Sequence, residues 1–310
     1  MADLQTVAIA GASGNLGSKI TESILQSLYK NKFKQIIILA RSQSAAVERL
    51  ASMGAIVRIY SEKNLTRVLS DVDVLINTVG PAGHHFKEQL LHAILETPIK
   101  LYFLSEFGVN HYIHDFPHQE WDEKKAHFQL AQSLLGSRVQ LCRVYAGLFL
   151  EDSIGPWFGF FTKDAKYEAV GSPEQRTSYT SMYDVGKALA MLASSPHASV
   201  PSEVQLSGDS KSMTEIAQIM EAHGSPTIQV TSVPLPPFKD KVLAEPIQTP
   251  ERNLRFLMGD GKIDHSLQGM GNQNSVIENA QDGDFTWRKI ESIAEATKGL
   301  PWADTPWAEA

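Results

Sequence analysis

The stretch "VAIAGASGNLGSKI", residues 7–20, joins an apolar run to three glycines and the start of a helical pattern. Gly11, Gly14 and Gly17 have the Gly-x-x-Gly-x-x-Gly spacing in the strand–turn–helix context that a dinucleotide-binding loop requires. The first glycine permits a tight turn, the second lets the backbone approach a pyrophosphate, and the third lets the helix pack against the strand. The N-terminus of that helix would offer free N–H groups to the phosphates. The stretch predicts a cofactor loop that also uses Ser13, Asn15 and Leu16. A glycine-rich turn without a ligand is the alternative.

Strand and helix patterns alternate through the first 150 residues. Apolar runs predict strands at 6–10, 35–40, 55–60, 73–79, 100–105 and 139–144, and segments of helical period lie between them. Continuous apolar strands that alternate with helices are typical of a parallel sheet covered on both faces. We therefore expect residues 1–150 to form a doubly wound α/β (Rossmann) domain that carries the dinucleotide loop.

The second half, residues 151–310, lacks the regular alternation of strand and helix patterns. We expect strands in "YEAVG" and "EVQLSG", and helices that begin at the capping boxes Ser181-x-x-Asp184 and Ser212-x-x-Glu215. "TWRKIESIAEATKG" predicts a last helix, whereas "PLPPFKDKVLAEPIQTP" has the pattern of an irregular loop. This half is expected to be a smaller α+β substrate lid, interleaved with the first domain and not joined to it by a linker.

Composition limits the partners. The chain has 310 residues, a formal charge of −7 and one cysteine. The negative charge gives no support to binding of nucleic acid or an anionic membrane, and no apolar run reaches the length of a membrane span. A single cysteine cannot form an internal disulfide, which favours a reducing compartment. We expect a cytoplasmic protein with a small-molecule partner; a homodimer is not excluded.

Arg41 decides the expected cofactor. It lies at the end of the second predicted strand, in "ILARSQS", where an acidic residue would bind the ribose hydroxyls of NAD. A guanidinium group can instead bind a 2′-phosphate through paired hydrogen bonds. The position therefore predicts NADP(H), with a solvated arginine at a strand end as the alternative.

"NTVGPAG", residues 77–83, ends the fourth predicted strand. The carboxyl ends of the strands border the crevice of such folds, so Val79, Gly80 and Pro81 are expected to flank the cofactor. His84 and His85 follow, but further ligands at a suitable spacing are missing, and we expect no metal site. The two histidines are expected on the surface at the start of a helix.

Several motifs together resemble those of the isoflavone-reductase-like, or NmrA-like, atypical short-chain dehydrogenases. They include "GASGNLG", "ILARS", "LSEFGVN", "KKAHFQLAQSLLGS", "RVYAGLFLEDSIG" and "YTSMYDVGKALAMLASSP". Plant members have an arginine four residues after a catalytic lysine, where this chain has Gln129, and a second basic residue near the position of Arg49. The aspartate that often ends the third strand is missing from "RIYSEKN". These departures suggest a fungal-type branch.

The resemblance implies that a lysine on the helix after the Ser-Glu-Phe-Gly turn is the catalytic acid or base and also binds the cofactor. Lys125 fits the family pattern of Lys-Ala-x-apolar with a glycine, Gly136, eleven residues later, and Lys124 does not. On a helix Trp121, Lys125 and Phe128 lie roughly on one face, and Lys124 projects about 100° away from it. The alternative is a solvated lysine in a charged run.

A second lysine pattern, Tyr183-x-x-x-Lys187, has the spacing of the catalytic pair of ordinary short-chain dehydrogenases. That pair belongs on the helix between the fifth and sixth strands, and Tyr183 follows the sixth predicted strand. We therefore interpret the motif as a helix start, with Asp184 in the cap and Tyr183 at most at the rim of the pocket.

Aromatic residues are expected to form the substrate wall beside the nicotinamide. The first candidates are Phe107, Phe149, Trp157, Phe158 and Tyr179, and Phe160 and Phe161 belong to the same group. An apolar pocket with one protonating group suits hydride transfer to a C=C, C=O or C=N bond. The leading hypothesis is an NADPH-dependent reductase of a small aromatic or conjugated metabolite of secondary metabolism. The alternatives are a non-catalytic NADP(H)-sensing regulator and a cofactor-assisted isomerase or cyclase.

Overall fold

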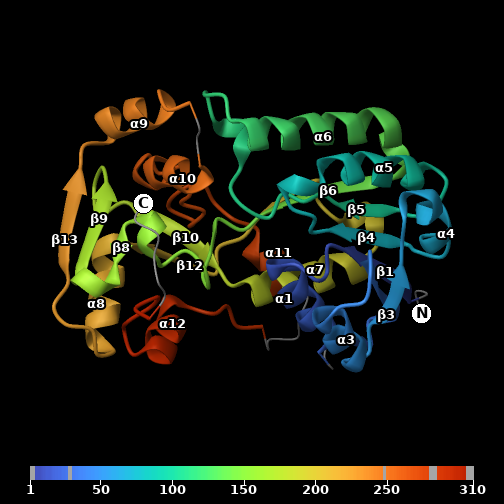
Figure 1. Ribbon diagram of the computed structural model, residues 1–310, viewed down its shortest axis with the longest axis horizontal. Helices are drawn as coiled ribbons and strands as arrows, with labels where there is room; N and C mark the ends of the chain where they lie inside the picture. The colour runs from blue at the N-terminus through green and yellow to red at the C-terminus, as the bar shows by residue number, and fades with distance from the viewer. Residues whose placement is uncertain (1–3, 27–29, 247–248, 279–284, 305–310) are drawn as a thin grey trace.

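The computed structural model of the protein describes residues 4–26, 30–246, 249–278 and 285–304. Its centre is a seven-stranded sheet with the order β3-β2-β1-β4-β5-β6-β11, in which every neighbouring pair is parallel (Figure 1). The strands are β1 (Gln5–Ala10), β2 (Phe33–Ala40), β3 (Ile56–Ile59), β4 (Val74–Asn77), β5 (Leu101–Phe103), β6 (Gln140–Tyr145) and β11 (Glu203–Gln205). The doubly wound α/β fold and its six predicted strands are confirmed. The order reverses between β1 and β4, which is where such sheets open a ligand crevice.

Helices cover both faces of this sheet (Figure 1). One face carries α1 (Asn15–Leu25), α3 (Ala45–Ser52) and α7 (Met182–Ser194), and the other carries α4 (Leu65–Val68), α5 (His84–Leu95) and α6 (Gln119–Leu135). Helices α1 and α7 come unusually close, because a Cβ atom at Gly186 would lie 2.7 Å from the Cβ of Ser23. The Ser23 hydroxyl also donates to the Tyr183 carbonyl at 2.9 Å. Two apolar cores, one for each face, hold these layers to the sheet.

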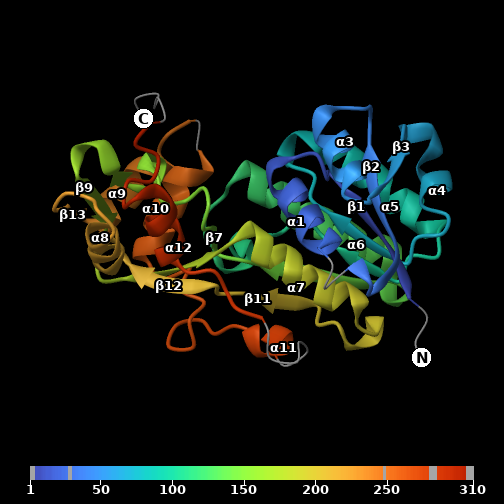
Figure 2. The ribbon, with the colours of Figure 1, turned by 90° about the horizontal axis from the view of Figure 1, so that it is seen from below.

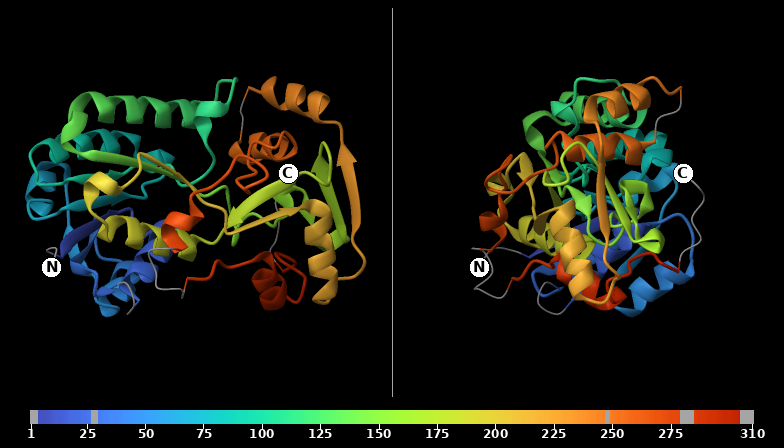
Figure 3. Two further views of the ribbon diagram at one scale, coloured as in Figure 1. Left: turned by 180° about the vertical axis from the view of Figure 1, so that it is seen from behind. Right: turned by 90° about the vertical axis from the view of Figure 1, so that its left-hand side faces the viewer.

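The rest of the chain forms a smaller α+β part with its own apolar core (Figure 2). It has two three-stranded sheets: β12 (Asp209–Ser212), β10 (Arg176–Thr180) and β7 (Leu148–Phe149); and β13 (Gln229–Val233), β9 (Lys166–Val170) and β8 (Phe160–Phe161). Its helices are α8 (Met213–Ala222), α9 (Leu235–Leu243), α10 (Pro250–Gly259) and α12 (Ile290–Thr297). Seen from behind, β13 lies at the end of the molecule opposite the N-terminal half (Figure 3).

The two parts are interleaved along the chain. After β10 the chain returns to the main sheet with α7 and β11, and the short helix α11 (Asn274–Glu278) packs its Ile277 into the same core as α7. Helix α7 and strand β11 lie beyond residue 150 and yet complete the parallel sheet and its cover. The boundary at residue 150 stays a prediction about domain organisation.

Local predictions held in part. The box at Ser212 and Glu215 forms both of its hydrogen bonds, whereas Ser181 caps α7 without a reciprocal bond from Asp184. The segment expected to be an irregular loop contains α9; its prolines fall in the first helical turn, where a missing N–H costs nothing. Helix α12 begins at Ile290, later than the sequence suggested. Among the described residues, no helix combines the length and apolarity needed to cross a bilayer.

Candidate active site

The glycine-rich loop between β1 and α1 has the geometry of a phosphate cradle. Gly11 has φ +82°, which only glycine adopts without strain, and a Cβ atom at Gly17 would lie 2.2 Å from the Gly11 carbonyl oxygen. The Gly14 N–H donates to that carbonyl at 2.9 Å, and no side chain caps the helix that starts after Gly14. The first N–H groups of α1 therefore face the crevice without an intrahelical partner.

Ser13, Gly14 and Asn15 are exposed on this loop, and Leu16 is partly buried. The Asn15 side-chain amide donates to the Asp152 carboxylate at 2.7 Å, so a residue just after β7 meets the loop. Asp152 thereby links the smaller part of the protein to the cofactor loop.

Arg41 is exposed immediately after β2, at the edge of the crevice. The Tyr60 N–H donates to the Ala40 carbonyl at 2.9 Å, so the end of β3 lies beside Arg41, and burial raises the pKa of the Tyr60 phenol. Arg49, the other basic residue considered for a 2′-phosphate, pairs with Glu22 at 2.6 Å. The glycine cradle, the uncapped helix start and the exposed guanidinium fit a dinucleotide that carries a 2′-phosphate.

A buried chain of hydrogen bonds fixes the turn after β4. The side-chain oxygen Oδ1 of Asn77 accepts from the Val79 N–H at 3.0 Å, and the side-chain amide of Asn77 donates to the Tyr102 hydroxyl at 2.7 Å. That hydroxyl lies 3.2 Å from Nε2 of His127 on α6. The Ser105 hydroxyl donates to the Val79 carbonyl at 2.9 Å. The predicted Val79–Pro81 turn is thus tied to β5 and α6, and Gly80 is exposed on it.

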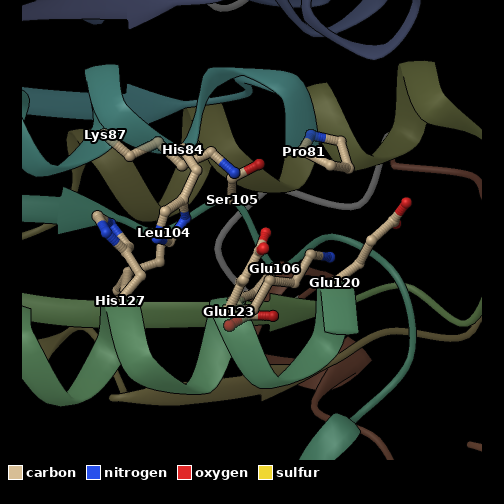
Figure 4. A pocket seen from close by; sticks show the side chains of 10 residues that line it. Pro81, His84, Lys87, Leu104, Ser105, Glu106, Glu120, Glu123 and His127 are labelled. Atoms are coloured by element: carbon tan, nitrogen blue, oxygen red, sulfur yellow. The ribbon is translucent and has the colours of Figure 1, made fainter. Parts of the chain in front are cut away.

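A cleft opens at this turn, between α5 and α6 (Figure 4). Its lining is mostly polar and comes from four segments: Pro81; His84 and Lys87 of α5; Leu104, Ser105 and Glu106 after β5; and Glu120, Glu123, Lys124 and His127 of α6. Three of the lining side chains are carboxylates and two are amines. His84, expected on the surface, lines the cleft, whereas His85 is three-quarters exposed.

The cleft contains Lys124, while Lys125 lies beside it. The Lys125 amine binds the Asp122 carboxylate at 3.1 Å, and its side chain is 24% exposed. The face that α6 buries carries Trp121, His127, Ala131 and Leu135, and Lys124 follows that face. Lys124 therefore lies on the side of α6 that meets α5 and the β5 turn, and Lys125 lies on a neighbouring side; which of the two is the catalytic lysine stays a prediction. The family pattern for Lys125 is independent of this geometry.

Some of the titratable side chains in and around the cleft are deeply buried. Glu106 and His111 are 1% and 2% exposed, and His111 Nε2 lies 3.7 Å from Glu106 Oε2. Burial raises the pKa of Glu106, and the nearest lysine, Lys124, opposes that effect. Burial, with a smaller contribution from Lys124, lowers the pKa of Lys87 to about 8. Sequence patterns missed Glu106 and Lys87: the first is part of a family motif without an assigned role, and the second follows the ordinary charge pattern of a helix.

The Tyr183 and Lys187 motif has structural contacts. The Lys187 amine binds Asp184 at 2.8 Å, and the fully buried Asp184 also accepts the Arg288 N–H at 2.6 Å. The Arg288 guanidinium lies 4.6 Å above the Tyr183 ring. These contacts fasten the segment before α12 to α7, on the face of the sheet opposite the cleft.

The five predicted substrate residues do not form one wall. Phe107 is 3% exposed in the core beneath α1 and α7, and Phe149 packs against that core. Phe158 and Tyr179 are buried in the core of the smaller part, where they also line a second small pocket beside Arg255, and Trp157 packs against the same core. The five residues divide between two cores, and their part in binding a substrate stays a prediction.

Within the described ranges, no group of three or more His, Cys, Asp or Glu side chains is arranged to hold a metal ion. Cys142 is fully buried in β6, and burial raises the pKa of its thiol to about 12.

Comparisons with known proteins agree with this architecture. A model of the NmrA-like family matches residues 3–279. The oxidoreductase swnR of Arthroderma benhamiae is 26% identical over 245 residues, which cover 74% of this chain and 77% of that protein. Leucoanthocyanidin reductase of Vitis vinifera, solved with NADPH, superposes with a TM-score of 0.76 at 17% identity, covering 94% of this chain and 99% of that one. Isoflavone reductase gives the same TM-score and identity, with 95% and 99% coverage. These structures establish the similarity of fold.

Proposed function

The chain belongs to the NmrA-like family, and on that premise we propose that it is an NADPH-dependent reductase of a small molecule. The observation that carries the proposal is the position of two features on one edge of the main sheet. The phosphate cradle follows β1, and the cleft with its lysines and carboxylates follows the neighbouring strands β4 and β5. The relative named as an oxidoreductase and the similar fold solved with NADPH support the same reading.

The cofactor would lie along the carboxyl edge of the strands. The loop from Gly11 to Gly17 would hold its pyrophosphate, Arg41 its 2′-phosphate, and the Val79–Pro81 turn would border the nicotinamide. Bound NADPH supplies a hydride. The residues of this chain orient it and provide the proton that completes the reduction.

Lys125 is the first candidate for the proton donor, because it matches the family pattern. Its amine forms an ion pair with Asp122, one turn earlier on the same helix. Lys124 is the second candidate, favoured by its place in the cleft lining. Either ammonium group can give a proton to an oxygen, carbon or nitrogen atom that becomes negative as hydride arrives.

The substrate is proposed to be an aromatic or conjugated compound with a reducible C=C, C=O or C=N bond. Charged groups around the cleft favour one that also carries polar substituents, since buried amines and carboxylates need partners when water is displaced. Its contacts would come from the cleft lining rather than from the buried aromatic residues Phe107 and Tyr179.

NADPH oxidation measured against a panel of enones, quinones and imines tests the proposal. Turnover of one acceptor is expected, with a loss of about 100-fold or more in the variant that lacks the donor, Lys125→Ala or Lys124→Ala. Tyr183→Phe is the matched control and should keep its rate. Tight binding of NADPH without turnover of any acceptor would contradict the proposal and favour the sensing regulator.

A further inference from the structure

The least explained feature of the cleft is its buried carboxylate. Glu106 follows β5 directly and is 1% exposed, yet its Oε2 atom has no hydrogen-bond partner. The closest basic group is Nε2 of His111, 3.7 Å away. A buried carboxylate without a hydrogen bond is costly, and such groups persist where another requirement retains them.

His111 is likewise buried and has a ring nitrogen without a hydrogen-bond partner. It is 2% exposed and stacks on Trp121 of α6 with the ring centroids 4.9 Å apart. Its Nδ1 atom is buried without a partner. Burial lowers the pKa of the imidazole well below its ordinary value, so the ring is neutral and can accept a hydrogen bond at Nε2.

Lys124 supplies the missing cation. Its Nζ atom lies 3.4 Å from His111 Nε2, so one ammonium group reaches the nitrogen that also faces Glu106. After burial, the positive charge of Lys124 has the largest effect on the pKa of Glu106 and on that of His111, and it lowers both. Three side chains from the β5 turn, the following loop and α6 thus meet at one point; Glu106 and Lys124 line the cleft, and His111 lies behind them.

We propose that Glu106 and His111 are positioning residues that hold the Lys124 ammonium group in the cleft, facing the Val79–Pro81 turn. This inference rests on the proposed reductase function for its chemical meaning. Held there, the Lys124 ammonium group would stabilise the negative charge that develops on the substrate as it is reduced, beside the group that donates the proton.

Other charged groups face this cluster from every side. They are Lys87 on α5, Arg143 on β6, Glu120, Glu123 and Lys125 on α6, and His114 and His118 in the preceding loop. Lys125 and Arg143 differ from Lys124 in having carboxylate partners of their own. Lys125 is bound to Asp122, and Arg143 to Glu203 at 2.8 Å. Among the described residues, the polar contact of Lys124 is with His111.

Reductive methylation with formaldehyde and a borane reagent, followed by site-resolved mass spectrometry, tests the positioning without a substrate. Lys124 should react slowly in the wild type, because its hydrogen bond to His111 must open first and a bond worth about 1 kcal/mol lowers the rate roughly fivefold. Glu106→Gln and His111→Gln should each raise the rate at Lys124 about fivefold and leave Lys125 unchanged. Glu48→Gln, exposed on α3, is the matched control. An unchanged rate at Lys124 in Glu106→Gln or in His111→Gln would overturn the proposal.

Saturating NADPH gives a second readout. It should slow methylation at Lys124 and not at Lys125, and protection of Lys125 alone would contradict the assignment. With an acceptor that the wild type reduces, Glu106→Gln should lower kcat at least tenfold with the KM for NADPH unchanged, and Glu106→Asp should restore part of kcat. If the wild type reduces no acceptor, the reductase proposal fails, while the methylation rates still decide the positioning of Lys124.

Discussion

Asn15 and Asp152 lie 137 positions apart in the chain and are joined by a hydrogen bond of 2.7 Å. Asn15 opens the first turn of α1, where the phosphates of the cofactor are expected, and Asp152 brings a negative charge to the same place. The bond therefore places a carboxylate of the smaller part near the phosphate cradle.

Removal of that charge should tighten cofactor binding. Asp152→Asn keeps the size of the side chain and removes its repulsion of phosphate, and we expect the Kd for NADPH to fall about threefold at low salt, as exposed charges act weakly. The measurement is NADPH fluorescence titration at two salt concentrations. Asp164→Asn, another exposed aspartate, should leave Kd unchanged. A weaker affinity in Asp152→Asn would mean that the carboxylate helps to hold the loop instead.

Arg41 should distinguish the two nicotinamide cofactors. Arg41→Ala removes the guanidinium expected on the 2′-phosphate, so the Kd for NADPH should rise about tenfold or more while that for NADH changes little. Calorimetry with both cofactors measures the effect. Arg67→Ala, exposed at the end of α4, serves as the control. An equal loss for both cofactors would rule out recognition of the phosphate.

Gly17 should tolerate no side chain. In Gly17→Ala the new Cβ would meet the Gly11 carbonyl at 2.2 Å and the Thr78 hydroxyl at 2.6 Å, which must push α1 away from β1. We expect a loss of at least about 2 kcal/mol in the free energy of unfolding, together with loss of NADPH binding. Urea unfolding checks the first effect. Gly108→Ala, where a Cβ would have nothing within 4 Å, should be neutral.

Asp184 should matter for stability and not for catalysis. Asp184→Asn removes the buried negative charge that pairs with Lys187 and weakens the hydrogen bond from the Arg288 backbone N–H. We expect a loss of about 3 kcal/mol in the free energy of unfolding. The activity of the folded fraction should persist. A catalytic role for the tyrosine and lysine motif would instead appear as a loss of turnover in Tyr183→Phe with unchanged stability.

His114 should make the protein sensitive to acid. Burial lowers its pKa from an ordinary 6.5 to about 4, so as pH falls the imidazole is protonated in the unfolded chain before it is protonated in the folded one. Its contribution to stability is complete above about pH 6.5 and is lost as pH falls toward 4. His114→Leu should flatten the fall in the free energy of unfolding over this range by about 2 kcal/mol. An unchanged slope would assign the acid sensitivity to other buried histidines, such as His127.

The sequence predicted the main sheet well because its signals are local. These signals are apolar runs of strand length, glycines at fixed spacing and helical periodicity, and each involves only residues close together in the sequence. Strands β1 to β6 formed where they were expected. Strand β11 was recognised as a strand, but its place beside β6 depends on the path that the chain takes through the smaller part.

The site was harder to predict, because it depends on which faces meet. The glycine loop and the exposed Arg41 follow from one strand–turn–helix unit and from one strand end. The aromatic residues expected to line one substrate wall do not lie together, since Phe107 and Tyr179 belong to different cores. The polar cleft was not predicted, because Lys87 and Glu106 come close only when α5 packs beside the β5 turn.

The sequence by itself determined the Rossmann topology, the cofactor loop and the family, since these depend on short-range pattern and spacing. Only the tertiary structure decided that Lys124 lines the cleft and that Glu106 and His111 meet it there. Adjacent residues on a helix differ by about 100° in direction, and which direction is functional depends on the neighbours that cover the helix. Those neighbours are set by packing, which a linear pattern does not contain.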